Sequence, residues 1–171
     1  MSRWRPPQAR GSNYITPEGF ERLKQELDAL WKKRRKVTVI LSAAAAEGDR
    51  SENAEYIYRK KQLREIDRRI RYLQKRLDEL ISVIQKPSDE NVVYFGAWVT
   101  LEDLDSNEHV YRIVGPDEFD FDPRYISMDS PVAKALMKKT IDDEVIIKLP
   151  QGQQHYCILK IQYTDGLLGL A

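Results

Sequence analysis

Two carboxylates, Asp49 and Glu52, stand three residues apart in the stretch GDRSENAEY, residues 48–56. Carboxylate oxygens at this spacing could hold Mg²⁺ or position a water for in-line attack on a phosphodiester. Two carboxylates alone make a poor magnesium site, because Mg²⁺ requires near-octahedral oxygen ligands and usually shares phosphates and further carboxylates. We therefore expect the pair to be half of a site that a partner's catalytic centre completes.

The same pair also has a purely structural interpretation. Asp-x-x-Glu is nearly a capping box, in which Asp49 accepts a hydrogen bond from the backbone N–H of Glu52 at the start of a helix. Both charges would suit the positive end of the helix dipole. Spacing alone favours capping over chemistry, but the two roles are compatible because a cap would fix the direction of the carboxylates.

Two heptad-patterned runs flank this stretch and must position it. Thr16 is the expected N-cap of the first helix, with Pro17 at its first position. In both runs the seam residues alternate at intervals of three and four, which is typical of a coiled coil. The first run is Phe20, Leu23, Leu27, Leu30, Arg34, Val37 and Leu41, and the second is Leu63, Ile66, Ile70, Leu73, Leu77, Leu80 and Ile84. The sequence thus predicts an antiparallel helical hairpin with the two carboxylates at its tip.

A band of basic residues follows the tip along the second helix. Between residues 59 and 76 only Glu65 and Asp67 are acidic, whereas a solvated coiled-coil face usually interleaves the two signs. The band predicts a phosphate track without base specificity, and the alternative is a solubilising face. Its nine members are Arg59, Lys60, Lys61, Arg64, Arg68, Arg69, Arg71, Lys75 and Arg76.

The second half of the chain has the pattern of a compact α+β unit with a mostly antiparallel sheet. Strands are expected at 92–101, 109–114, 143–149 and 155–163. A short helix is expected after Ser130 as N-cap, with Pro131 at its first position. The predicted organisation is a flexible basic leader (1–13), the hairpin (14–86), a linker (87–91), the sheet domain (92–163) and a tail (164–171).

The net charge also differs between the two halves of the chain. Residues 1–86 carry 21 Lys and Arg against 12 Asp and Glu, and residues 87–171 carry 7 against 15. This asymmetry favours different partners for the two halves, with a polyanion for the basic one, although simple attraction between the halves is the alternative. Cys157 is the only cysteine, which excludes an internal disulfide and a Cys-rich zinc site. With no signal peptide or membrane-length apolar run, we expect a cytoplasmic protein that is a monomer and meets no membrane.

Three stretches resemble the bacterial Gre-type transcript-cleavage factors, in particular the GreB branch. They are GDRSENAEY at 48–56, KKQLREIDRRIRYL at 60–73, and YFGAWVTL with YRIVG and YISMDSPVAKALMKK in the second half. The resemblance covers about residues 14 to 163. It implies an N-terminal coiled coil that enters the secondary channel of RNA polymerase, and a C-terminal FKBP-like domain that grips the channel's rim.

The resemblance also implies roles for individual residues. Asp49 and Glu52 would help the polymerase bind a second Mg²⁺, so that it hydrolyses backtracked RNA near the 3′ end. This makes the protein a factor that lends residues to another enzyme, with no stably bound cofactor of its own. The tip neighbours that would shape the site are Arg50, Ser51, Asn53 and Tyr56. The segment that would dock on the polymerase is Asp129, Ser130 and Pro131. The residues that would contact extruded RNA are Arg59, Lys60, Lys61, Arg64, Arg68, Arg69 and Arg71.

Three other functions compete with this one. The first is a channel-binding transcription regulator that does no chemistry. The second is an RNA-binding arm attached to an interaction domain, without any polymerase. The weakest is a self-contained nuclease, because the tip offers no further acidic cluster for two metal sites and His109 and His155 fall on or beside the distant sheet.

Overall fold

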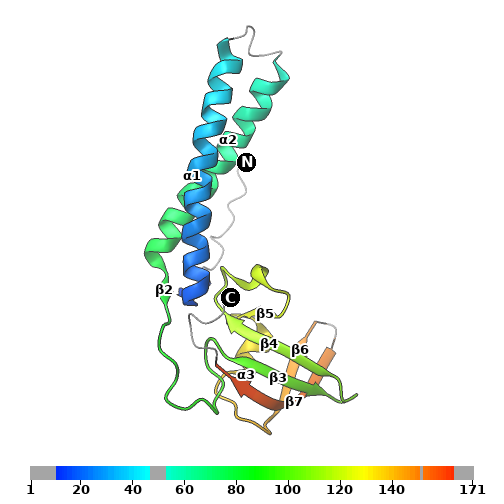
Figure 1. The fold of residues 1–171 in the computed structure, drawn as a ribbon. Helices are drawn as coiled ribbons and strands as arrows, with labels where there is room; N and C mark the ends of the chain where they lie inside the picture. The colour runs from blue at the N-terminus through cyan, green and yellow to red at the C-terminus, as the bar shows by residue number, and fades with distance from the viewer. Residues whose placement is uncertain (1–10, 47–52, 151, 164–171) are drawn as a thin grey trace, which may run out of the picture. The chain divides into compact units, whose positions relative to one another are not determined.

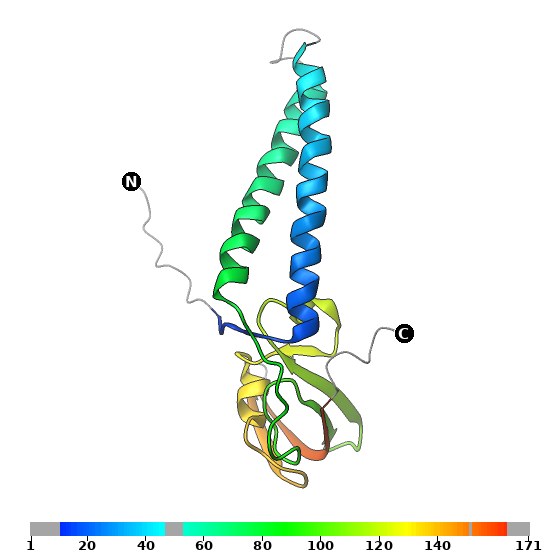
Figure 2. The ribbon, with the colours of Figure 1, turned by 60° about the vertical axis from the view of Figure 1, so that its left-hand side comes forward.

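The computed structural model describes residues 11–46, 53–150 and 152–163. Two long antiparallel helices, α1 (Pro17–Ala46) and α2 (Ala54–Glu79), form the predicted hairpin (Figures 1 and 2). At ~1.5 Å per residue, helices of 30 and 26 residues are about 45 and 39 Å long. The tip stretch between them falls largely outside the described residues.

The N-terminus of α1 has the expected cap. The Thr16 hydroxyl oxygen accepts a hydrogen bond from the backbone N–H of Gly19 at 3.1 Å, and Pro17 is the first helical residue. Proline suits this position because its missing N–H would have no partner inside the helix.

The hairpin core uses the predicted seam. Val37 of α1 and Ile66 and Ile70 of α2 are buried, and Leu27, Leu30, Trp31 and Leu63 pack against them. The polar seam residue Arg34 donates through Nε to Oδ1 of Asp67 at 2.6 Å. The guanidinium therefore has an interhelical partner at a position where an unpaired charge would be unfavourable.

Both ends of α2 differ from the prediction. Its N-cap is Asn53, which accepts from the Tyr56 N–H at 3.1 Å, so the observed cap is not Asp49. The helix ends at Glu79 with Leu80 as C-cap. Ile84, assigned to the seam, lies beyond the helix and is 80% exposed, so that assignment was wrong.

The chain leaves α2 to form a short parallel pair. β2 (Ile81–Ser82) pairs with β1 (Tyr14–Ile15), and the Val83 N–H donates to the Ile15 carbonyl at 3.0 Å. Because of these contacts the chain divides into one compact unit of Phe20–Leu80 and another of Met1–Gly19 with Ile81–Ala171. The domain boundaries expected from sequence, 14–86 and 92–163, stay a prediction.

The second unit contains a five-stranded sheet in the order β5-β4-β3-β7-β6. Its strands are β3 (Trp98–Asp103), β4 (Glu108–Val114), β5 (Tyr125–Ser127), β6 (Glu144–Leu149) and β7 (Gly152–Gln162). All pairings are antiparallel except β4 with β5, which confirms a mostly antiparallel sheet. The sequence did not predict β5 or the 3₁₀ turn η1 (Phe119–Phe121) before it.

One short helix, α3 (Pro131–Leu136), covers part of the sheet core. The Ser130 hydroxyl accepts from the Ala133 N–H at 3.1 Å, as expected for its N-cap. Ala133 and Leu136 are fully buried with strand residues such as Val99, Leu101 and Ile158. The predicted α+β class, a helical hairpin followed by a sheet domain with a short helix, is therefore confirmed. In the described part of the chain no helix is long and apolar enough to cross a membrane.

Candidate functional site: the hairpin tip and its basic surface

Of the six tip residues predicted to act together, four lie outside the described residues: Asp49, Arg50, Ser51 and Glu52. The remaining two, Asn53 and Tyr56, are joined by the helix-capping hydrogen bond. Asn53 also donates through Nδ2 to the carbonyl of Ala44 at 3.2 Å. One amide side chain thus ties the last turn of α1 to the first turn of α2, directly after the stretch that carries the two carboxylates.

Five members of the basic band on α2 are exposed and make no hydrogen bond or ion pair with any part of the chain that the structure describes. This set of exposed α2 cations consists of Lys61, Arg64, Arg68, Arg71 and Lys75. A cation without an internal partner retains its charge for a ligand phosphate. These five are therefore the strongest candidates for polyanion contacts.

Three other members of the band have partners within the hairpin. Arg69 binds Glu26 of α1 through two hydrogen bonds of 2.7 and 2.9 Å. Arg59 lies 3.5 Å from Glu55, and Arg76 is buried with its Nη1 3.8 Å from Glu79. The structure thus divides residues that sequence alone treated alike, since these three would have to exchange a carboxylate for a phosphate.

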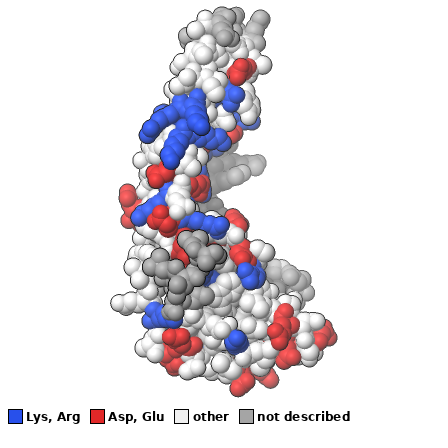
Figure 3. Space-filling view, viewed as in Figure 1, with Lys and Arg blue, Asp and Glu red and all other residues white. Residues whose placement is uncertain are grey.

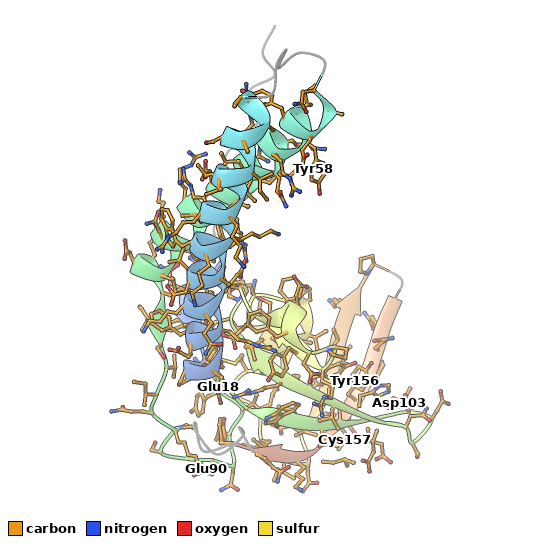
Figure 4. All side chains as sticks on the ribbon, turned by 45° about the horizontal axis from the view of Figure 1, so that its top comes forward. Glu18, Tyr58, Glu90, Asp103, Tyr156 and Cys157 are labelled. Atoms are coloured by element: carbon orange, nitrogen blue, oxygen red, sulfur yellow. The ribbon has the colours of Figure 1, made fainter. Side chains whose placement is uncertain are left out.

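Aromatic rings lie among the cations. Tyr58 is 60% exposed near the tip end of α2, with the Arg59 guanidinium 5.4 Å from its ring centroid (Figure 4). Further along α2, the Arg69 guanidinium lies 5.2 Å from the Tyr72 ring. The basic band predicted phosphate contacts alone, because a sequence does not show that the Tyr58 ring is exposed. An exposed aromatic ring beside cations can stack an unpaired base.

The predicted docking residues have structural partners of their own. The Asp129 carboxylate accepts from the Ser12 backbone N–H at 2.8 Å and from its hydroxyl at 2.5 Å. Ser130 caps α3, and Pro131 begins that helix. The segment is therefore held in a fixed shape, and a partner that needed the Asp129 carboxylate would share or replace Ser12.

The buried carboxylate of Glu118 binds the backbone directly before α1. Glu118 has no exposed surface, and its Oε2 accepts from the Thr16 N–H at 2.9 Å, while its Oε1 is without a partner among the described residues. Burial raises the pKa of Glu118 to about 7, against the lowering effect of the Thr16 hydrogen bonds. Nothing in the sequence marks Glu118 as buried, because the residues beside it along the chain do not show which side chains cover it.

A helical hairpin with partnerless cations behind its tip, followed by a mostly antiparallel sheet, defines a protein with one surface suited to a polyanion. Residues 13–81 match the family described as transcription elongation factor, N-terminal, and residues 87–163 match transcription elongation factor, GreA/GreB, C-term. The chain therefore belongs to the GreA/GreB family of transcription elongation factors.

Individual relatives agree with this family. The transcription elongation factor GreB of Xanthomonas axonopodis pv. citri is 58% identical over 167 residues, covering 96% of this chain and 99% of that protein. GreB of Pseudomonas aeruginosa is 56% identical, covering 97% and 99%. Among solved structures, Gfh1 of Thermus thermophilus is 26% identical and covers 87% of this chain and 97% of its own, with a TM-score of 0.40.

Proposed function

We propose that this protein inserts its hairpin into the secondary channel of RNA polymerase and stimulates hydrolysis of backtracked RNA near the 3′ end. Such cleavage would rescue arrested complexes and aid fidelity. The polymerase would remain the enzyme, and the factor would supply carboxylates. We further propose a cytoplasmic monomer that binds no metal stably by itself.

The proposal rests chiefly on one feature, the five exposed α2 cations that run along the helix from behind the tip. RNA extruded from a backtracked complex is a single strand of phosphates, and such cations bind it without reading its sequence. A strand bound along these cations would lead toward the stretch that carries Asp49 and Glu52, because Lys61 follows Glu52 by nine positions in the sequence. We place its 3′ region at that end.

The proposed chemistry is divided between the two proteins. Asp49 and Glu52 would provide oxygen ligands for a Mg²⁺ that the polymerase and the RNA phosphate also hold, which supplies the ligands that the pair lacks. A metal held there would supply an activated water for hydrolysis of the phosphodiester. The bond between phosphorus and O3′ would break, so that the retained RNA would end in a 3′-hydroxyl and the released fragment would carry the phosphate at its 5′ end. Asn53 would limit the freedom of the tip because it fastens α2 to α1 immediately afterwards.

The test compares RNA cleavage in halted, backtracked polymerase complexes with wild type and with Asp49→Asn, Glu52→Gln. We expect wild type to release 3′ fragments rapidly, including fragments longer than dinucleotides. The variant should lose more than about 100-fold in rate while still binding the polymerase, because even outer-shell partners of metal sites are worth 10–100-fold.

The matched control is Glu55→Gln, Glu65→Gln, which removes two carboxylates of α2 and leaves Asp49 and Glu52 intact. We expect cleavage close to that of wild type. If wild type binds polymerase without speeding cleavage, the protein is instead a regulator that does no chemistry. If the tip variant loses binding as well, the pair is structural.

A further inference from the structure

A second group of cations lies on α1, where the sequence reads Lys-Lys-Arg-Arg-Lys at residues 32–36. Arg34 pairs with Asp67 of α2. The other four, Lys32, Lys33, Arg35 and Lys36, are exposed and have no hydrogen bond or ion pair with the described residues. We call these four the α1 cluster.

Helix geometry spreads the α1 cluster around the outer side of the hairpin. Successive residues turn by 100°, so five in a row pass through more than one full turn within about 6 Å of helix length. Arg34 faces the partner helix, and its four neighbours are directed to the remaining sides. The cations therefore form an arc across the helix, whereas the exposed α2 cations run along theirs.

The two cation groups lie at the same level of the hairpin. The Arg34–Asp67 hydrogen bond and the packing of Val37 with Ile66 and Ile70 fix residues 32–36 beside residues 64–70. Arg64 and Arg68 fall in that stretch. On the face of the hairpin that Figure 3 shows, Lys and Arg side chains gather at one level, below a section near the tip with little charge.

The α1 cluster is unfavourable for the free helix. Lys32 lies one turn from Arg35 and Lys36, and like charges at these spacings destabilise a helix. Asp28, one turn before Lys32, forms no ion pair among the described residues. A ligand of opposite charge would remove the repulsion that the chain itself leaves uncompensated.

We propose that the α1 cluster binds phosphates of single-stranded RNA together with the exposed α2 cations, so that the RNA passes across both helices. This rests on the proposed function and extends it, because the RNA site would be a collar around the hairpin. The curvature favours a single strand. Two helices, each about 10–12 Å wide, are a narrow support. A flexible strand can follow such a support, whereas duplex DNA with a persistence length of about 50 nm cannot.

The first experiment measures binding of a fluorescein-labelled 12-nucleotide oligo(U) RNA to the full chain by anisotropy over a range of KCl. The test variant is Lys32→Gln, Lys33→Gln, Arg35→Gln and Lys36→Gln, since glutamine has a helix propensity close to that of lysine. The control is Lys134→Gln, Lys139→Gln, Lys148→Gln and Lys160→Gln, which makes the same change of charge in the other unit. All four control residues are exposed.

For wild type and control we expect the same affinity and salt dependence. The test variant should bind at least about 10-fold more weakly at low salt. Its slope of log Kobs against log salt should be smaller by about 3, because four lost phosphate contacts each contribute about 0.7. Lys32→Arg, Lys33→Arg, Lys36→Arg should bind like wild type, which would show that positive charge is what the RNA requires, and a circular dichroism spectrum of the test variant equal to that of wild type would exclude a folding defect.

Three results would overturn the inference. Wild-type affinity in the test variant would make the α1 cluster a solvated face, and an equal loss in the control would show a general charge effect. If the test variant lost as much affinity for polymerase without RNA as it lost for oligo(U), the α1 cluster would be a protein contact and not an RNA site. The anisotropy experiment needs no polymerase. The proposed RNA site on the α1 cluster can therefore be contradicted while the protein still stimulates cleavage, and it can be supported while the cleavage proposal is contradicted.

Discussion

Glu118 illustrates how one side chain can determine the pH dependence of this protein. Its folded pKa of about 7 lies above an ordinary value of 4.5. As pH rises between these values, the unfolded chain releases the proton and the folded chain retains it, so the free energy of unfolding decreases. Above pH 7 the folded state carries a buried charge with one oxygen lacking a described partner.

Glu118→Gln should remove this loss of stability. The amide oxygen can still accept from the Thr16 N–H, and no proton is released. We expect the variant to gain up to about 3 kcal/mol at pH 8 relative to its difference from wild type at pH 4, since one pKa unit corresponds to about 1.36 kcal/mol. Urea unfolding of both proteins across this range measures the effect, and parallel pH profiles would contradict the assignment.

Glu118 also restricts which residue can stand at position 19, where the chain has glycine. A Cβ at this position would collide with the Glu118 carboxylate, although alanine would otherwise favour the helix. Gly19→Ala should therefore lower the free energy of unfolding by about 1–3 kcal/mol, as overpacking does. Thermal unfolding at pH 6 would measure this, with Glu21→Ala, an exposed position of the same helix, as control. A gain in stability would show that Glu118 moves aside easily.

Among the elements, the junction of the two helices depends most on one side chain. Asn53 caps α2 and donates to the last turn of α1. Asn53→Ala should cost about 1 kcal/mol, the usual value of an N-cap. Hydrogen exchange should show faster exchange of the Tyr56 amide and unchanged exchange in the middle of α2 near Ile70. Uniformly unchanged exchange would mean that the cap contributes nothing.

Element-level comparison shows which features could be predicted. The seam was predictable because its period follows from helix geometry, and β4 and β6 were predictable from runs of apolar residues. The end of α2 was not. Ile84 continues the heptad spacing, but the β1–β2 pairing takes the chain out of the helix at Leu80, and a pairing partner 67 positions away has no local signal.

The sequence predicts which residue types form the candidate site, but it does not predict which of the basic side chains already have partners within the chain. The sequence indicated a basic band, yet only the structure distinguishes Arg69, bound to Glu26, from Arg68, which has no hydrogen bond or ion pair with the described residues. The α1 cluster was overlooked because five adjacent cations do not follow one helix face. Asp129 was predicted to dock on the polymerase. Its hydrogen bond with Ser12 joins residues 117 positions apart, which no local pattern reveals.

For the whole molecule, the exposed cations of the hairpin lead to a prediction about how RNA affinity depends on salt concentration. The two proposals assign nine cations to phosphate contacts, the five exposed α2 cations and the four of the α1 cluster. At about 0.7 per contact, the slope of log Kobs against log salt for single-stranded RNA should lie between about −3 and −6. A salt titration of RNA binding by the full chain measures it. A slope near zero would mean that neither helix binds RNA through phosphates.

The proposed mechanism requires that Asp49 and Glu52 supply oxygen ligands for a Mg²⁺ that the polymerase also binds. It is tested most directly by measuring cleavage in backtracked complexes as a function of Mg²⁺ concentration, with saturating wild type, Asp49→Asn or no factor. Wild type should reach half-maximal cleavage at a much lower Mg²⁺ concentration than the other two, because the pair contributes oxygen ligands. If wild type and Asp49→Asn share one Mg²⁺ dependence and differ only in maximal rate, the carboxylates hold no metal and the account is wrong.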